Sequence, residues 1–327
     1  MSEKVLVTGG AGYIGSKIVT DLIKKKKIVY IIDNLSTGHK FLINKKAIFL
    51  KSNIGDKKKI AKFIKLNQLK SIIHCAASLD VSESEKNPKK YFINNYINTK
   101  KLLEVCVDND LKNFIFSSTC AVYGNTSGKI SENKKTNPVS NYGKTKLMCE
   151  ELIKKLSKKF NFNYGILRYF NVAGSDMKNK IGCINKNGQL IKNLSSSIVN
   201  NKNKISVYGN DYNTKDGTCI RDYIHINDIS EIHLKLLKTI SRKNKSYLLN
   251  CGYGIGFSVL EIIKRFEIIC NINIQKIFLT RRKGDIEAIF SDTKKINKIL
   301  DCKLINKNKL NEIIKSSIAW EEFLNEK

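Results

Sequence analysis

A tyrosine with a lysine four residues after it stands in residues 141–146, which read N-Y-G-K-T-K. On a helix this spacing places Tyr142 and Lys146 on one face. An ammonium group beside a phenol favours the phenolate, so we expect Lys146 to lower the pKa of Tyr142 and make it a usable proton acceptor or donor. Lys144 is two residues from the tyrosine and is expected to point elsewhere. The chain holds 59 Lys and Arg residues, so spacing rather than residue type singles out Lys146.

The elements that must position this pair follow a strand-then-helix pattern. Short β-branched segments predict strands, and amphipathic, lysine-faced segments predict the helices between them. The pattern indicates an α/β fold: a doubly wound parallel sheet with helices on both faces, followed after Gly174 by a smaller, mixed C-terminal domain. The strands are expected at 5–8, 28–32, 71–74, 114–117 and 164–168, and the helices at 14–26, 56–67, 88–108 and 141–160.

Hydroxyl side chains end the fourth predicted strand in the run S-S-T, which includes Ser117 and Thr119. Doubly wound folds bind their ligands at the carboxyl edge of the sheet, where this run lies. We therefore expect a hydroxyl of this run to share a proton with Tyr142.

Three glycines, Gly9, Gly12 and Gly15, follow the first predicted strand and open the first predicted helix. In this context they permit a tight turn, close approach of a pyrophosphate, and packing of the helix on the strand. Asp33 stands 18 residues after Gly15, at the end of the second strand. A carboxylate there accepts hydrogen bonds from ribose hydroxyls and repels a 2′-phosphate. The segment therefore predicts a site for NAD rather than NADP.

The formal net charge of +30 raises the alternative of a nucleic-acid-binding protein. The lysines recur along the whole chain, however, and form no basic stripe with interleaved aromatics. Lysine, asparagine and isoleucine are abundant and there are only two prolines, as expected of an A/T-rich coding sequence. We expect no nucleic-acid partner.

Nine cysteines, widely spaced and without a C-x-x-C pair, argue against a disulfide framework, and the four histidines give no zinc pattern. We expect no metal. The N-terminus reaches glycines after a short apolar run, and no stretch of 18 uncharged apolar residues follows. These features predict a soluble, cytoplasmic protein that does not enter a membrane.

The chain resembles the extended short-chain dehydrogenase/reductase family over nearly its whole length, and within that family it resembles the nucleotide-sugar 4-epimerases. The motifs that carry the resemblance are T-G-G-A-G-Y-I-G-S (8–16), D-N-L-S (33–36), H-C-A-A-S (74–78), S-S-T-C-A-V-Y-G (117–124), N-Y-G-K-T-K (141–146), R-Y-F-N-V-A-G (168–174), Y-G-N-D-Y (208–212), D-G-T-C-I-R-D-Y-I-H (216–225) and R-R-K-G-D (281–285). Single motifs are widespread among sugar-nucleotide enzymes, but the ordered set is specific.

This resemblance implies that UDP-glucose and UDP-galactose are interconverted through a 4-keto sugar, with NAD as the hydride carrier. It implies that Tyr142 is the base, that Lys146 lowers its pKa and holds the nicotinamide ribose, and that Thr119 bonds the sugar O4. The remaining cofactor positions that it implies are Gly9, Gly12, Tyr13, Ile14, Gly15, Asp33, Asn34, Ser36, Asn53, Ile54, Ala76, Ala77, Asn95, Ser117 and Tyr169.

For the substrate, the resemblance assigns Tyr208 to stacking on the uracil, and Arg221, Arg282 and Asp285 to phosphates and ribose. Arginine suits a diphosphate because its fork donates two parallel charge-assisted bonds. Pairing of each arginine with a surface acid is the plainer alternative. The diphosphate and its surroundings are assigned to Asn171, Asn193 and Leu194.

Departures from the family pattern bear on specificity. Asn53 replaces a common aspartate near the adenine, Leu79 replaces a lysine near the cofactor, and Ile289 replaces a tyrosine that narrows the sugar pocket. Isoleucine leaves room for an acetamido group, so UDP-N-acetylglucosamine is an expected second substrate, unless neighbouring side chains refill the space. A 4,6-dehydratase is the closest rival, but Cys120 and Ala121 stand where those enzymes place Asp-Glu.

The resemblance also implies two domains and a homodimer. An NAD-binding domain is expected at 1–174 plus about 218–243, and a UDP-sugar domain at about 175–217 and 244–327. The dimer is expected to pack helices 88–108 and 141–160 into a four-helix bundle. An apolar stripe on the second helix allows this, although it could equally face the sheet; it consists of Leu147, Met148, Leu152, Ile153 and Leu156. A non-catalytic sensor of NAD or nucleotide sugar is a further alternative, disfavoured by the intact Thr119, Tyr142 and Lys146.

Overall fold

The computed structural model describes residues 3–185, 189–282, 285–302 and 309–326. The chain divides into two compact units. Unit 1 comprises Met1–Gly124, Thr136–Arg168 and Ile229–Leu249, and unit 2 comprises Asn125–Lys135, Tyr169–Asp228 and Asn250–Lys327.

A seven-stranded sheet in the order β11-β7-β5-β4-β1-β2-β3 organises unit 1. Its strands are β1 (Lys4–Thr8), β2 (Ile28–Asp33), β3 (Ile48–Lys51), β4 (Ser71–His74), β5 (Asn113–Thr119), β7 (Asn163–Tyr169) and β11 (Tyr247–Cys251). Strands β1 to β5 pair in parallel, and β1 lies between β2 and β4. The strand order therefore reverses at β1, where such folds bind ligands at the carboxyl ends of the strands. The predicted doubly wound α/β class is confirmed.

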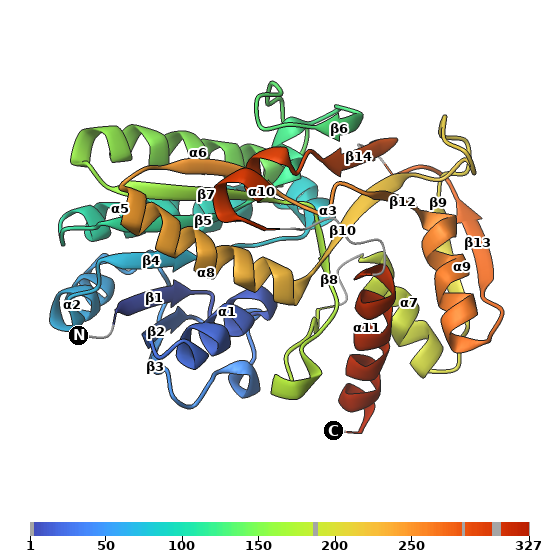
Figure 1. Cartoon of the computed structure of the whole chain (residues 1–327), viewed down its shortest axis with the longest axis horizontal. Coiled ribbons are helices and arrows are strands. Elements are labelled where there is room, and N and C mark those ends of the chain that lie inside the picture. The colour runs from blue at the N-terminus through green and yellow to red at the C-terminus, as the bar shows by residue number, and fades with distance from the viewer. Residues whose placement is uncertain (1–2, 186–188, 283–284, 303–308, 327) are drawn as a thin grey trace. The chain divides into compact units, whose positions relative to one another are not determined.

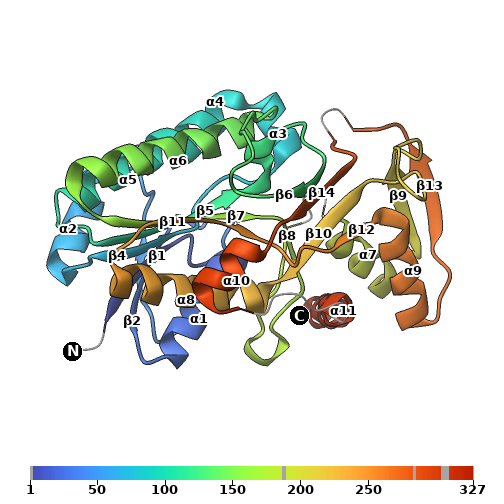
Figure 2. The same cartoon turned by 45° about the horizontal axis from the view of Figure 1, so that its top comes forward.

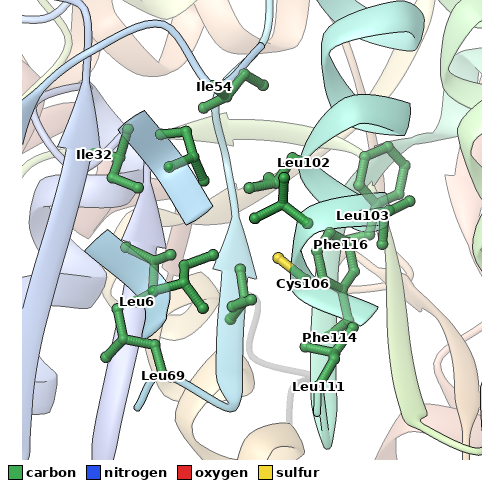
Figure 3. Close-up of a cluster of buried hydrophobic side chains, with 14 of the residues drawn as sticks. Leu6, Ile32, Ile54, Leu69, Leu102, Leu103, Cys106, Leu111, Phe114 and Phe116 are labelled. Carbon is green, nitrogen blue, oxygen red and sulfur yellow. The ribbon is translucent and has the colours of Figure 1, made fainter. Parts of the chain in front are cut away.

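Helices cover both faces of this sheet (Figures 1 and 2). One face carries α2 (Lys57–Asn67), α5 (Asn98–Val107) and α6 (Asn141–Phe160), and the other carries α1 (Tyr13–Lys24) and α8 (Ile226–Lys243). Apolar side chains between the sheet and the first three helices form a buried core, part of which Figure 3 shows. Its members include Leu6, Ile32, Ile60, Ile64, Leu102, Leu103, Cys106, Phe114, Phe116, Cys149 and Ile153. Burial of this apolar area is the main force that fixes α6 on β5.

The predicted helix at 88–108 is present in three parts: α4 (Pro88–Tyr91), the π-helical segment η2 (Phe92–Ile97) and α5. The wider turn accompanies a buried side chain, Asn95, which accepts a hydrogen bond from Ser78 N (2.8 Å) and donates one to Ser78 O (3.0 Å). Pro88 begins α4, as predicted. The sequence analysis missed β3 and the short helix α3 (Val81–Lys86), which Asp80 caps by accepting from Glu83 N.

Unit 2 contains a sheet in the order β12-β10-β14-β6, with β8 paired to β10, and a separate pair of strands, β9 and β13. The strands are β6 (Gly128–Ile130), β8 (Asn171–Ala173), β9 (Lys204–Tyr208), β10 (Ile220–His225), β12 (Gly256–Ser258), β13 (Gln275–Leu279) and β14 (Ala288–Ser291). The helices are α7 (Leu190–Val199), α9 (Val259–Cys270), α10 (Lys294–Leu300) and α11 (Lys309–Asn325). Unit 2 also takes in three segments that the predicted bounds left with the NAD-binding domain: residues 125–135, 169–174 and 218–228. They group here, rather than with the seven-stranded sheet, because β6, β8 and β10 pair within the sheet of unit 2.

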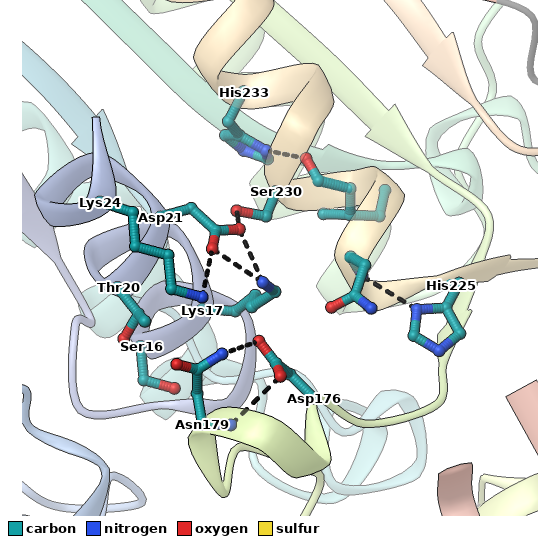
Figure 4. A network of polar contacts seen from close by, with 12 residues as sticks. Ser16, Lys17, Thr20, Asp21, Lys24, Asp176, Asn179, His225, Ser230 and His233 are labelled. Atoms are coloured by element: carbon teal, nitrogen blue, oxygen red, sulfur yellow. Dashed lines mark hydrogen bonds and ion pairs between the residues drawn. The ribbon is translucent and has the colours of Figure 1, made fainter. Parts of the chain in front are cut away.

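Polar contacts fix α1 to α8 in unit 1 (Figure 4). Asp21 on α1 accepts a hydrogen bond from Ser230 Oγ on α8 (2.7 Å) and forms ion pairs with Lys17 and Lys24. Within the described ranges, no helix is long and apolar enough to cross a membrane. All nine cysteines lie in the described part of the chain, where none of them forms a disulfide.

Two buried histidines make the stability of unit 1 sensitive to acid. His74 lies between the hydroxyls of Thr8 (2.6 Å) and Thr99 (2.8 Å), and His233 lies against Ile229 O (2.7 Å; Figure 4). Burial, and secondarily the charge of Lys146, lowers the pKa of His74 to about 3. Burial likewise lowers the pKa of His233 to about 4. Both side chains are therefore neutral in the folded protein at neutral pH.

Because the folded pKa values lie below the unfolded ones, this stability is present above about pH 6.5 and is lost as the pH falls toward 4 and then 3. Between pH 7.5 and 5 we expect the free energy of unfolding to fall by roughly 2 kcal/mol for each histidine. Urea denaturation of the wild type and of His233→Gln at both pH values measures this. The variant should lose about 2 kcal/mol less than the wild type, and equal losses would contradict the assignment.

Candidate active site

The loop after β1 is built for close backbone packing. Gly9 has a positive φ of 71°, and a Cβ there would lie 2.7 Å from Ala76 N. A Cβ at Gly15 would lie 2.1 Å from Gly9 O, so the first turn of α1 tolerates no side chain at that position. Gly12 is different, because a Cβ there would meet only Gly9 O, at 3.3 Å. The space that a side chain at Gly12 would enter is thus open apart from this carbonyl oxygen and the two neighbouring residues.

The N-terminus of α1 begins at Tyr13 without a side-chain cap and without an acidic residue in its first turn. Its first backbone N–H groups and the positive end of the helix dipole therefore suit an anion. Together with the uncovered Gly12, this arrangement fits the pyrophosphate of a dinucleotide.

Asp33, at the end of β2, is held in place by two backbone N–H groups. It is 8% exposed, and it accepts hydrogen bonds from Ala11 N (3.0 Å) and Leu35 N (2.8 Å). A carboxylate has about four lone-pair positions, so acceptor capacity remains for two hydroxyls. Asn34 next to it accepts from Ser36 N (3.0 Å), which shapes the turn that follows.

Other predicted cofactor residues lie on the loops after β3 and β4. Asn53 accepts from Gly55 N (2.8 Å), Ile54 is buried, and Ala76 packs against the core cluster. Ala77 and the exposed Leu79 follow on the same loop, which Asn95 holds through Ser78. Tyr169 closes β7 and groups with unit 2.

Tyr142 lies in the first turn of α6 and is 9% exposed. The side chain of Ser140 caps this helix by accepting from Gly143 N (3.1 Å), which fixes the turn that carries the tyrosine. The Tyr142 side chain lies close enough to Thr119, at the end of β5, for the threonine to favour the phenolate and so lower the pKa of Tyr142. Thr119 Oγ1 also accepts from Ala121 N (3.1 Å), which leaves its hydroxyl proton for another acceptor. The structure thus brings together the predicted tyrosine and the predicted hydroxyl.

Lys146 lies one helical turn beyond Tyr142 and is 2% exposed. Its Nζ donates to the carbonyl oxygen of Ser117 (2.8 Å) and lies 5.9 Å from the centroid of the Tyr142 ring. Burial lowers the pKa of this lysine to about 8. Lys144 is exposed, as expected from its spacing.

The prediction that Lys146 lowers the pKa of Tyr142 is wrong for the protein by itself. Burial raises the pKa of Tyr142 above its ordinary value, and Thr119 opposes only part of that rise. Lys146 Nζ lies 5.9 Å from the ring centroid and donates to the Ser117 carbonyl, and its charge does not reverse the rise. The prediction that the two side chains share one face of the helix was correct. The burial of the Tyr142 phenol, which raises its pKa, was not predicted.

Three buried neighbours of this pair were missed: Ser118 on β5, Glu150 on α6 and Arg168 on β7. Glu150 and Arg168 form a buried ion pair, and Ser118 Oγ donates to Glu150 (2.5 Å). The sequence could have indicated Glu150, because it follows Lys146 by four residues, just as Lys146 follows Tyr142, and therefore lies on the same face of the helix.

In unit 2, two arginines share one carboxylate. Arg221 Nη2 lies 3.3 Å from Asp285 Oδ1, and Arg282 Nε lies 2.8 Å from Asp285 Oδ2. The Arg282 guanidinium also lies 4.8 Å from the centroid of the half-exposed Tyr208 ring. Pairing with an acid, the plainer alternative, is therefore present, but one carboxylate cannot neutralise two arginines. The cluster keeps an excess positive charge that suits an anion.

The remaining predicted substrate residues lie on neighbouring elements of unit 2. Ile289 on β14 pairs in register with Arg221 on β10 and is 2% exposed. Asn171 on β8 is exposed and pairs with Tyr223 of β10. Asn193 and the buried Leu194 are in the first half of α7. Lys283 and Gly284 of the R-R-K-G-D motif lie outside the described residues.

Comparison with known proteins agrees with this geometry. A sequence profile of the NAD dependent epimerase/dehydratase family matches residues 5–252. The chain is 36% identical over 321 residues to a UDP-glucose 4-epimerase from Lactobacillus helveticus, covering 98% of this chain and 97% of that protein.

Two solved structures resemble the fold closely. The structure of a UDP-glucose-4-epimerase from Stenotrophomonas maltophila, with bound NAD and formylated UDP-arabinopyranose, has a TM-score of 0.94 at 30% identity and matches over 99% of both chains. The structure of the UDP-Glc/GlcNAc 4-epimerase from Campylobacter jejuni has a TM-score of 0.85 at 36% identity, over 98% of this chain and 100% of that one. From its sequence profile, its glycine loop and its Tyr-Lys helix, the chain belongs to the NAD dependent epimerase/dehydratase family.

Proposed function

We propose that this protein interconverts UDP-glucose and UDP-galactose, with NAD as the hydride carrier. The observation that carries the proposal is that Tyr142 lies near Thr119, with Lys146 one turn further along α6, at the carboxyl edge of the sheet in a chain of this NAD-dependent family. The relatives from Lactobacillus helveticus and Stenotrophomonas maltophila, both named UDP-glucose 4-epimerases, support the choice of substrate.

On this proposal, unit 1 holds the cofactor. Gly12 and the uncapped N-terminus of α1 receive the pyrophosphate, and Asp33 accepts from the adenosine ribose hydroxyls. When bound, NAD supplies a reversible hydride acceptor for C4 of the hexose. Lys146 holds the nicotinamide ribose, since its ammonium group is fixed at the end of β5.

The phenolate form of Tyr142, which the positive charge of a bound oxidised nicotinamide would favour, takes the proton from the sugar O4, and the resulting phenol returns it after the 4-keto sugar has turned over. Its phenol is buried, so the proton moves within a water-poor site rather than to bulk solvent. Thr119 donates its hydroxyl proton to the oxygen that carries negative charge at each stage, because its own oxygen is already engaged by Ala121 N. The reaction has no net oxidation, so one proton shuttle is sufficient.

Unit 2 binds the UDP part of the substrate. Arg221 and Arg282 donate to the diphosphate, and Asp285 sets their orientation and accepts from the ribose. Tyr208 stacks on the uracil with the ring face that Arg282 leaves uncovered. Asn171, Asn193 and Leu194 contribute to the surroundings of the diphosphate.

UDP-N-acetylglucosamine is the second proposed substrate. Ile289 shares a sheet face with Arg221, which on this proposal lies at the diphosphate, so its side chain borders the sugar. The relative from Campylobacter jejuni is named a UDP-Glc/GlcNAc 4-epimerase, which supports a wide sugar pocket in a chain of this kind.

A homodimer is also proposed, but only part of the apolar stripe on α6 is available for its interface. Ile153 is buried, and Leu152 and Leu156 pack against the core cluster, so this part of the stripe faces the sheet. The exposed Phe92 and Ile93 on η2 support an interface there instead.

The test of the proposed function is an assay of the purified protein with UDP-galactose and UDP-N-acetylgalactosamine in parallel, with the epimers separated. Epimerisation of both is the expected result. Turnover of UDP-galactose alone would support the proposed epimerase activity and contradict the proposed wide sugar pocket. Absence of turnover with either substrate would refute the proposal.

A further inference from the structure

Helix α6 presents three side chains, each one turn apart, to three consecutive residues at the end of β5. Tyr142 lies near the side chain of Thr119, and Lys146 Nζ donates to the carbonyl oxygen of Ser117 (2.8 Å). Glu150 accepts from Ser118 Oγ (2.5 Å). The third contact continues the row formed by the two proposed functional residues, so the proposed active face of α6 extends one turn further than Tyr142 and Lys146.

Glu150 is fully buried, which makes its negative charge costly unless it is paired. Arg168 on β7 provides the pairing with two parallel hydrogen bonds, Nε to Oε1 (2.9 Å) and Nη2 to Oε2 (2.6 Å). This bidentate geometry gives directional as well as electrostatic restraint. The carboxylate therefore ties α6, β5 and β7 together at one point.

Arg168 also contacts the chain on the other side of Thr119. Its guanidinium lies 4.7 Å from the centroid of the Tyr123 ring, in the turn that follows β5. Ser118 precedes Thr119 and Tyr123 follows it, and both are buried. The ion pair thus holds Ser118, immediately before Thr119, and Tyr123, four residues after it.

The charge of Glu150 bears on Lys146 as well. The titratable groups that face Lys146 are His74 and Cys75 at the end of β4, and Tyr142, Cys149 and Glu150 on α6. Burial lowers the pKa of Lys146, while negative charge at Cys149, Cys75 and Glu150 opposes the lowering.

Near neutral pH the opposing charge comes from Glu150. Burial raises the pKa of Cys149 to about 12 and that of Cys75 to about 11, so both thiols are protonated there. Burial and the charge of Lys146 keep His74 neutral, and burial also raises the pKa of the Tyr142 phenol. Glu150 therefore helps to keep Lys146 in its ammonium form.

We propose that Glu150 and Arg168 are positioning residues for the epimerase reaction: their ion pair fixes the segment that carries Thr119 opposite Tyr142, and the Glu150 carboxylate sustains the charge of Lys146. The inference rests on the proposed function for its kinetic consequences, but its structural and electrostatic parts concern the protein alone.

Two variants separate the positioning role of the ion pair from the effect of Glu150 on the charge of Lys146. Ser118→Ala removes the link between Glu150 and β5 and keeps both charges. Glu150→Gln combined with Arg168→Met removes both charges while an amide oxygen still accepts from Ser118. The double variant is chosen because loss of one partner would leave a buried unpaired charge and destabilise the fold, whereas removal of both is often nearly neutral.

For Ser118→Ala we expect kcat for UDP-galactose to fall roughly threefold to tenfold, with KM and the pH profile unchanged. For the double variant we expect a fall of roughly tenfold to a hundredfold, and the alkaline limb of kcat should move to lower pH because Lys146 loses its proton more readily. Competitive acetylation of Lys146 followed by mass spectrometry measures its pKa without turnover, and this pKa should fall in the double variant alone.

The matched control is Lys192→Met with Glu321→Gln, which removes a similarly buried ion pair of unit 2. It should leave the pH dependence of kcat and the pKa of Lys146 unchanged. A wild-type kcat in Ser118→Ala, or an unchanged pKa of Lys146 in the folded double variant, would overturn the inference. If the wild type fails to turn over UDP-galactose, the proposed function fails, and the Lys146 measurement still decides the electrostatic part.

Discussion

Tyr142→Phe is expected to reduce kcat for UDP-galactose by roughly a thousandfold, while the protein stays folded and retains NAD. The change removes one oxygen from a side chain that is 9% exposed and leaves the ring and its packing in place. The neighbouring Thr119 keeps its hydrogen bond from Ala121 N, so the end of β5 should not rearrange. The fall in kcat would therefore result from the loss of proton transfer and not from misfolding.

The measurement is steady-state kinetics with UDP-galactose, together with thermal unfolding and the NAD content of the purified variant. KM should change little, because the proposed nucleotide contacts lie in unit 2. Tyr164→Phe is the matched control: Tyr164 is a partly buried tyrosine of the same unit on β7, and its loss should leave kcat unchanged. A Tyr142→Phe variant within tenfold of the wild type would show that another group moves the O4 proton.

Local periodicity explains why part of the site was predictable. The four-residue spacing of Tyr142 and Lys146 is read directly from the chain, and α6 spans the predicted residues 141–160. The glycines after β1 and the carboxylate that ends β2 also follow from residue type and position, since only backbone geometry is required of them.

Properties that depend on burial or on distant partners were not predictable in this way. The direction of the Tyr142 pKa shift follows from how deeply α6 packs on β5, which no local pattern reports. The Glu150–Arg168 pair joins residues 18 apart in the sequence across two elements. The boundaries of unit 2 likewise depend on strand pairing, since the short β6 is assigned by its pairing with β14, far along the chain.

Ile289→Tyr is expected to reduce kcat/KM for UDP-N-acetylgalactosamine roughly a hundredfold. The same change should alter kcat/KM for UDP-galactose by less than about threefold. The position is rigid, because β14 is paired on both sides and Asp222 accepts hydrogen bonds from Ser291 N (3.0 Å) and Ser291 Oγ (2.7 Å). A larger side chain at a residue that is 2% exposed cannot be absorbed by movement of this strand. It should therefore occupy the space proposed for the acetamido group.

The assay compares the two UDP-sugars at equal concentration, with the free energy of unfolding measured alongside, since a larger core side chain costs about 1–3 kcal/mol. Ile289→Leu conserves volume and should leave both activities within about twofold of the wild type, because swaps of this kind are tolerated best. The selectivity is decisive because misfolding or a displaced Arg221 would reduce both activities together. An equal loss for the two substrates in Ile289→Tyr would therefore place Ile289 in the packing of β14 and outside the sugar pocket.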